Sequence, residues 1–146
     1  NAEKALAESE EVVRVLQLEI IRSSLFEAQG ILHELKEEDE LAIESYKQQL
    51  VLDPTNSSIH VQIGRCYRNI REFKKAEESI QKTLIIHPFG PKTNYELALV
   101  YAETGKHEKA LEHLKIAQGI WEEADPDYKP AILARDKLTE LEALIR

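Results

Sequence analysis

The chain has 146 residues, of which 42% are hydrophobic and 32% are charged, a composition that predicts one soluble globular domain and excludes a disordered chain. Its 27 acidic residues outnumber its 19 lysines and arginines, and the net charge of −8 argues against binding to nucleic-acid phosphates. The single cysteine excludes an intrachain disulfide, and no apolar run reaches the length of about 18 residues that a membrane span needs. We therefore expect a cytoplasmic protein with neither a nucleic-acid nor a membrane partner.

Residues 1–22 predict an N-terminal helix that either caps the fold or links it to another segment. Apolar residues recur at helical spacing at Leu6, Val13, Leu16 and Ile20. This spacing is close to a heptad but shorter than the three or four heptads typical of a coiled coil, so a dimerising helix stays as an alternative. Because the chain begins Asn-Ala and contains no methionine, we interpret it as a piece of a longer protein.

Residues 23–124 contain three copies of a 34-residue unit, 23–56, 57–90 and 91–124, which align without a gap. Each copy has the pattern of a helix, a short turn, a second helix and a break. Small residues coincide where two helices would approach closely, and a proline closes the first two copies because it cannot continue a helix. The aligned positions are Gly30, Gly64 and Ala98; Ala42, Ala76 and Ala110; and Pro54, Pro88 and Glu122.

These units resemble the tetratricopeptide repeat. The middle copy carries the pattern most fully, with Ile63, Gly64, Tyr67, Ala76, Ile80 and Pro88. The other copies match in part, at Phe26, Gly30, Ala42, Tyr46 and Pro54, and at Leu97, Ala98, Tyr101, Gly105, Ala110, Leu114 and Ala117. The departures are His33, Gln49, Thr83 and Glu122. The resemblance implies an all-α fold, a right-handed α-α superhelix (solenoid) of three helix-turn-helix repeats with flanking N- and C-terminal helices.

Residues 125–146 predict a C-terminal capping helix. Prolines at positions 126 and 130 mark its entry, and an apolar stripe follows at Ile132, Leu133, Leu138, Leu141 and Leu144. We expect this stripe to cover the last repeat.

Cys66 lies between two arginines and is the one candidate for a reactive thiol or an anion site. It aligns with Leu32 and Val100 in the other two copies and falls in the middle of a predicted helix. We therefore interpret it as a core residue, since free cysteines are among the most buried residues. A small-ligand or enzymatic site around Cys66 is the least favoured alternative.

No other residues form a catalytic or metal-binding pattern. His107 and His113 are six residues apart, whereas two ligands on one helical face need a spacing of about three or four. The acidic run at 37–40 falls in a predicted turn, where solvated carboxylates are typical. We expect no enzymatic activity, no metal and no cofactor.

The resemblance implies that the first helix of each repeat lines a concave groove. Its predicted stripe has Arg65 and Arg68 at the centre, glutamates on both sides and apolar residues between them. Such a stripe suits an extended peptide or a helix that carries an acidic residue between apolar ones. In the alternative, the two arginines only neutralise neighbouring glutamates. The predicted groove residues are Glu27, Ile31, Glu34, Val61, Arg65, Arg68, Asn69, Tyr95, Leu99 and Glu103.

Two of these positions argue against one class of partner, the acidic C-terminal peptides of chaperones. Family members that hold the acidic C-terminal peptides of chaperones clamp the terminal carboxylate with a lysine and an asparagine, and Glu27 and Ile31 occupy those positions here. We predict a non-catalytic protein-protein interaction scaffold that forms a module of a larger protein and binds a protein or peptide partner of unknown identity. The alternative is self-association through the N-terminal helix, which would give a homo-oligomer.

Overall fold

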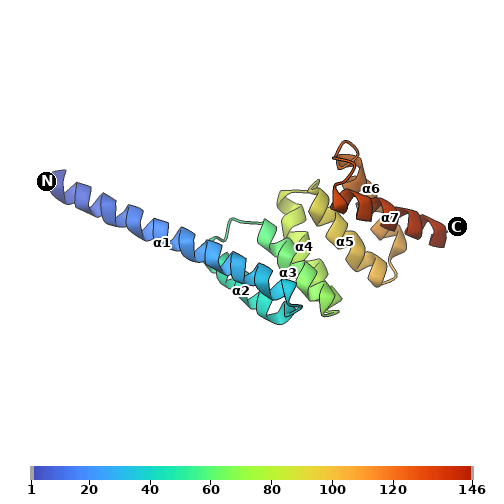
Figure 1. The fold of residues 1–146 in the computed structure, drawn as a ribbon, viewed down its shortest axis with the longest axis horizontal. Helices are drawn as coiled ribbons and strands as arrows, with labels where there is room; N and C mark the ends of the chain where they lie inside the picture. Colours follow the sequence, from blue (N-terminus) through green and yellow to red (C-terminus); the bar gives the residue numbers. More distant parts are fainter. Residues whose placement is uncertain (1, 146) are drawn as a thin grey trace. The chain divides into compact units, whose positions relative to one another are not determined.

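The structure, a computed structural model, describes residues 2–145, with the side chains of residues 4–145. These residues form seven α-helices and no strand, which agrees with the predicted all-α fold. The helices are α1 (Ala2–Leu35), α2 (Asp39–Leu52), α3 (Ser58–Asn69), α4 (Phe73–Ile86), α5 (Pro91–Glu103), α6 (His107–Ile120) and α7 (Lys129–Ile145) (Figure 1). The chain divides into two compact units, Asn1–Ile59 and His60–Arg146.

The first unit is built on α1, a single helix of 34 residues that continues from the N-terminal segment into the first repeat without a break (Figure 1). Ser24 lies inside this helix, and its hydroxyl donates to the carbonyl of Ile20 at 3.1 Å, a bond that serines within helices commonly form. The proposed boundary at residue 22 therefore falls within a helix.

Close contact between α1 and α2 depends on the small residues that the alignment singled out. Gly30 and Ala42 are buried, and a Cβ atom on Gly30 would overlap the ring of Tyr46, which is itself fully buried. His33 occupies a position where an aromatic residue was expected. Its Nδ1 lies 2.7 Å from the Glu38 carboxylate, so it ties the end of α1 to the start of α2.

The turns inside the three helical pairs have the same geometry. Glu37, Arg71 and Gly105 have positive φ angles of 60°, 64° and 75° and lie 34 residues apart in the chain. In each turn the amide of the following residue donates to a carbonyl five residues earlier at 2.8 to 2.9 Å, the hydrogen bond that ends a helix in a Schellman motif. Only the third copy has glycine at this left-handed position, where other residues are strained.

The second unit encloses a hydrophobic core between α4, α5, α6 and α7. Its buried residues are Ala76, Ile80, Leu97, Ala98, Val100, Tyr101, Ala110, Leu114, Ala117, Trp121, Ala134 and Leu141. The helix α3 packs closely against α4, as Gly64 shows: a Cβ atom at this position would overlap the side chain of Ile80. The hydroxyl of Ser79 also donates to the carbonyl of His60 at 2.9 Å.

The helix α7 covers this core, but not with the whole stripe that the sequence predicts. Leu141 is buried and Leu138 packs against the core, whereas Leu133 and Leu144 are exposed. Ala134 is fully buried instead. A helix that packs closely enough to bury an alanine turns its neighbouring leucine away from the core, so the predicted stripe was wrong for Leu133 and Leu144.

Candidate protein-interaction surface

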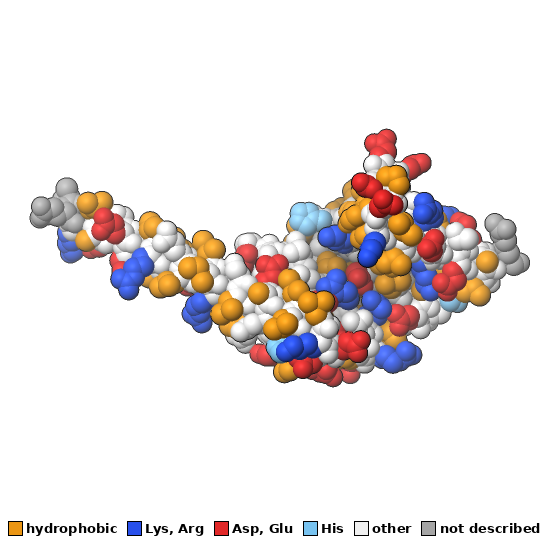
Figure 2. Space-filling view, in the orientation of Figure 1, with side chains coloured by type: hydrophobic (Ala, Val, Ile, Leu, Met, Phe, Trp, Pro, Cys, Tyr) orange, Lys and Arg blue, Asp and Glu red, His pale blue; other side chains and the backbone are white. Residues whose placement is uncertain are grey.

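The predicted groove residues of the first unit lie on α1 and differ in their surroundings. Glu34 accepts a hydrogen bond from the Tyr46 hydroxyl, so this carboxylate is part of the α1–α2 contact. Glu27 is half-buried and lines a depression together with Gln49 and Asp53 near the end of α2. Ile31 is exposed, like many of the apolar side chains that Figure 2 shows along α1.

Arg68 forms two ion pairs within the predicted groove of the second unit. Its Nη1 lies 3.0 Å from the Glu103 carboxylate and its Nη2 lies 3.4 Å from the Glu96 carboxylate. Only 18% of the Arg68 side chain is exposed. The ion pairs join α3 to α5, so Arg68 does not point freely outward as the sequence suggested. Arg68 therefore fits the alternative given in the sequence analysis, in which the arginine neutralises neighbouring glutamates.

The electrostatics around Arg68 follow from this arrangement. One guanidinium group faces two carboxylates, so the centre of the surface is not cationic. The pKa of the Tyr95 hydroxyl is raised by burial and by the negative charge of Glu96, while Arg68 partly opposes the shift. The Nε atom of Arg68 is buried and has no hydrogen-bond partner among the described residues. Arg65 is half-buried, one turn earlier on α3.

Two predicted apolar residues lie beside this ion-pair cluster on α5. Tyr95 and Leu99 are half-buried, and the ring centroid of Tyr95 lies 6.1 Å from that of Trp121. Trp121 in turn contacts Tyr128 edge-on, with centroids 5.8 Å apart. The sequence analysis did not include Trp121 and Tyr128 among the site residues, although Trp121 is the only tryptophan of the chain and lies near the end of the third predicted repeat. Trp121 packs against the Tyr95 ring, and Tyr128 packs against Trp121, so these contacts restrict the position of Tyr95.

We use the name α3–α5 surface for six predicted groove residues on these two helices, which the ion pair between Arg68 and Glu103 joins. Asn69, at the end of α3, is exposed beside them. The surface is mixed, with half-buried apolar side chains around a neutralised arginine. It consists of Val61, Arg65, Arg68, Tyr95, Leu99 and Glu103.

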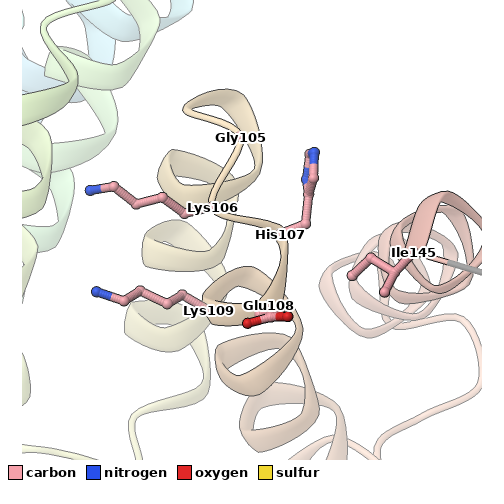
Figure 3. Close-up of a pocket in the computed structure, with 6 residues that line it drawn as sticks. All are labelled: Gly105, Lys106, His107, Glu108, Lys109 and Ile145. Atoms are coloured by element: carbon pink, nitrogen blue, oxygen red, sulfur yellow. The ribbon is translucent and has the colours of Figure 1, made fainter.

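A shallow depression at the start of α6 does not have the features of a ligand site. It is lined by residues 105–109 and by Ile145 of α7. Figure 3 shows the side chains of Lys106 and Lys109 extending to one side of α6, away from His107 and Ile145. The polar groups therefore do not converge on a common point.

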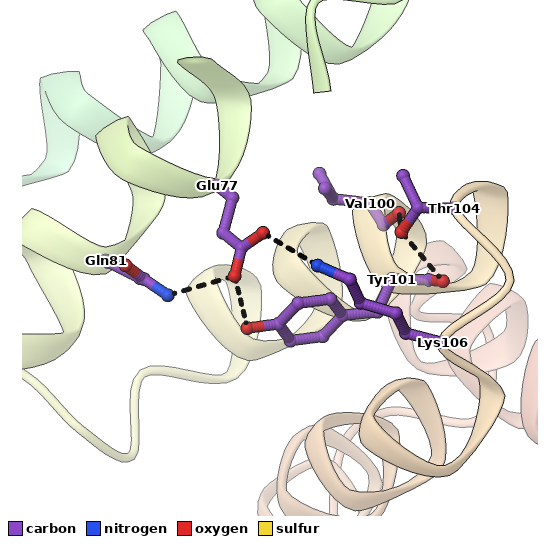
Figure 4. Close-up of polar contacts among 6 residues, drawn as sticks. All are labelled: Glu77, Gln81, Val100, Tyr101, Thr104 and Lys106. Carbon is purple, nitrogen blue, oxygen red and sulfur yellow. Dashed lines mark hydrogen bonds and ion pairs between the residues drawn. The ribbon is translucent and has the colours of Figure 1, made fainter. Parts of the chain in front are cut away.

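A partly buried polar network lies between α4, α5 and the turn that follows α5. Glu77 accepts a hydrogen bond from the Tyr101 hydroxyl at 2.9 Å and pairs with Lys106 at 3.2 Å (Figure 4). Gln81 donates to the same carboxylate at 3.2 Å. Burial and the Glu77 carboxylate raise the pKa of Tyr101. This network fastens the two helical pairs of the second unit to each other, and the sequence analysis did not identify it.

Asn94 and His113 form a second network that the sequence analysis did not identify. Asn94 is fully buried, and its Nδ2 donates to the carbonyls of Pro88 and Gly90 at 2.9 and 3.0 Å. Its Oδ1 lies 2.8 Å from Nδ1 of His113, and since Oδ1 only accepts, His113 carries its proton on Nδ1. Burial and the charge of Lys109 lower the pKa of His113, although Glu112 opposes the shift.

The interpretation of Cys66 as a core residue is confirmed, because none of its surface is exposed and it lies within α3. Ile63 and Gly64 are buried with it. Among residues 4–145, no three His, Cys, Asp or Glu side chains lie together as metal ligands would. Nor does any helix in the described part of the chain combine the length and apolar character needed to cross a bilayer.

The geometry above defines a class of protein, the all-α proteins built from helix-turn-helix repeats. Residues 91–120 match the family model of the tetratricopeptide repeat. This match supports the resemblance to the tetratricopeptide repeat, and the predicted helical-repeat solenoid fold is confirmed. No match was found among curated protein sequences.

Solved structures with the same fold cover most of the chain at low identity. The secretion translocator chaperone SycD of Yersinia enterocolitica matches with a TM-score of 0.78 and 14% identity over 85% of this chain and 94% of its own. The TPR2B domain of yeast Sti1, in complex with an Hsp70 peptide segment, matches at 0.75 and 16% over 86% and 99%. PcrH, in complex with the chaperone-binding region of PopD, matches at 0.74 and 16% over 84% and 92%.

Proposed function

We propose that this chain is a non-catalytic protein-interaction module that binds an extended peptide or a helix of a partner protein. Structural neighbours support the proposal, since PcrH is seen with a segment of PopD and the first such domain of Spaghetti with the HSP90 peptide SRMEEVD. In the proposed module, the three repeats occupy residues 23–56, 57–90 and 91–124, and the segments 1–22 and 125–146 flank them.

The α3–α5 surface is the observation that carries this proposal. Tyr95 and Leu99 leave apolar surface partly exposed on α5, and rigid aromatic side chains that are already held in place lose little entropy when they bind. The neutralised Arg68 beside them favours a partner that contributes apolar side chains rather than one selected by acidity. Arg65 and Glu103 would then orient the partner from the rim of the surface.

A peptide library displayed on phage tests the proposal with a defined probe. Peptides selected on the wild-type protein should bind at least tenfold more weakly to a Tyr95→Ala/Leu99→Glu variant, because hot-spot side chains each contribute roughly 1 to 4 kcal/mol. Leu133→Glu is the matched control, since Leu133 is exposed on α7 and lies outside the α3–α5 surface. Circular dichroism checks that each variant stays folded. Failure to select any peptide, or equal binding by the double variant, would contradict the proposal.

Arg68→Glu is a poor test of the same surface. It would place a third carboxylate beside Glu96 and Glu103, so a loss of binding could reflect a disturbed fold. Arg65→Glu is the better charge variant, and it should reduce binding less than the apolar double variant does.

A further inference from the structure

A stripe of apolar side chains on the C-terminal half of α1 is exposed on the described surface of the first unit. Its residues recur at alternating intervals of three and four positions, which is the a/d spacing of a coiled-coil seam. The five large members have 49% to 78% of their surface exposed, and Ala28 is exposed as well. We call it the leucine stripe. It consists of Leu18, Ile21, Leu25, Ala28, Leu32 and Leu35.

The leucine stripe lies away from α2. Gly30 marks the side of α1 that packs on Tyr46, and at 100° per residue it lies roughly 160° around the helix from Ala28 and from Leu32. The stripe also differs from the N-terminal positions that the sequence analysis considered. There, serines at positions 9 and 23 interrupt the seam, whereas the leucine stripe runs through six successive a/d positions without a polar residue.

From this geometry we infer that the leucine stripe binds the same stripe of a second copy of the chain, with the two α1 helices antiparallel. The stripe is its own complement in that orientation. Leu18 meets the second copy's Leu35, Ile21 meets its Leu32, and Leu25 meets its Ala28. All layers form in one register, and the central layers pair a large side chain with a small one, which fills space without overlap.

Charge selects the antiparallel arrangement over the parallel one. The a/d positions before the stripe are Glu11 and Arg14. In a parallel pair each would face its own copy, and like charges in a seam are destabilising. In the antiparallel pair Leu18 meets the end of the second copy's α1, so Glu11 and Arg14 lie beyond that helix.

The exposed area is sufficient for a specific dimer. Five side chains that are half to three-quarters exposed present about 500 Å² on each copy, and a pair removes on the order of 1,000 Å² from water. This is the lower end of specific interfaces, so we expect a reversible dimer. The proposal is independent of peptide binding by the α3–α5 surface.

Analytical ultracentrifugation of the whole chain tests the dimer. The wild-type protein should sediment as a concentration-dependent dimer, and Leu25→Glu/Leu32→Glu should raise the dissociation constant at least a hundredfold. Leu6→Glu/Val13→Glu is the matched control on the same helix, with equally exposed residues outside the stripe, and should leave dimerisation unchanged. A monomeric wild-type protein overturns the inference, as does a dimer that only the control variant disrupts. The Tyr95→Ala/Leu99→Glu variant should still dimerise, which separates this test from the peptide-binding test.

Disulfide cross-linking tests the orientation. Leu18→Cys and Leu35→Cys proteins, when mixed under oxidising conditions, should form a cross-linked heterodimer. Neither should cross-link to itself, because positions 18 and 18 of an antiparallel pair lie roughly 25 Å apart along the helix, beyond the reach of a disulfide. Cys66 is fully buried and adds no background. Self-cross-linking of each variant would show a parallel pair and overturn the inferred orientation.

Discussion

Gly64→Ala is expected to destabilise the protein although it replaces a glycine inside a helix. On an open helical surface the change would stabilise by roughly 1 kcal/mol, because glycine has more conformational entropy to lose on folding. Here the added Cβ would overlap Cγ1 of Ile80 and lie 3.0 Å from its Cδ1 and 3.2 Å from the Ala76 carbonyl oxygen. Both Ile80 and Ala76 are fully buried, so neither yields easily. Overpacking of this kind costs roughly 1 to 3 kcal/mol, and we expect a net loss of about 1 to 2 kcal/mol.

Urea unfolding followed by circular dichroism measures this loss. Gly119→Ala is the control, because beyond the adjoining backbone of α6 itself no atom of the described residues lies within 4 Å of its Cβ position, and it should gain up to about 1 kcal/mol. Ile80→Ala removes the atoms that the new methyl group meets. The loss caused by Gly64→Ala should therefore shrink in the Ile80→Ala background, with a coupling energy of about 1 to 2 kcal/mol. A Gly64→Ala protein at least as stable as the wild type would refute the argument from close helix approach.

Two further predictions follow from the turns and from the buried histidines. Glu37→Gly should raise the free energy of unfolding in urea by relieving a left-handed backbone, and Gly105→Ala should lower it, each by roughly 1 kcal/mol; opposite signs would contradict the strain at these turns. His113 and His60 both have a pKa below the ordinary value of 6.5, chiefly because of burial. The unfolded chain therefore binds more protons than the folded one below that value, and stability should fall from about pH 7.5 to about pH 5.5. In His113→Gln this fall should be smaller, and an unchanged fall would exclude His113 as its source.

Much of the fold could be predicted because it depends on local periodicity. Small residues at Gly30, Gly64 and Ala76 are buried where the 34-residue alignment placed close helical contacts. Cys66 and Val100 are buried as their shared position in the period predicts, whereas Leu32, at the same position of the first copy, is exposed. Even the turns repeat at this interval, although at Glu37 and Arg71 no glycine signals the left-handed residue.

Partners across the repeats depended on the tertiary structure. The sequence placed Arg68 on an outward stripe, but which carboxylates it meets depends on how α3 packs beside α5, and Glu96 was not among the predicted residues. The network of Glu77 and Tyr101 joins positions 24 residues apart, which no helical period relates.

The sequence by itself determined the helical repeat and most of its buried positions. Small, aromatic and proline residues that recur every 34 residues allow few ways of packing one helix against the next. Only the tertiary structure decided which surfaces stay open. The exposed fraction of Leu25 or Leu32 depends on what packs against α1, and α2 covers the opposite side of that helix. Apolar residues on two faces of α1 look alike in the sequence, and burial by a neighbouring helix is what distinguishes a core face from an interaction face.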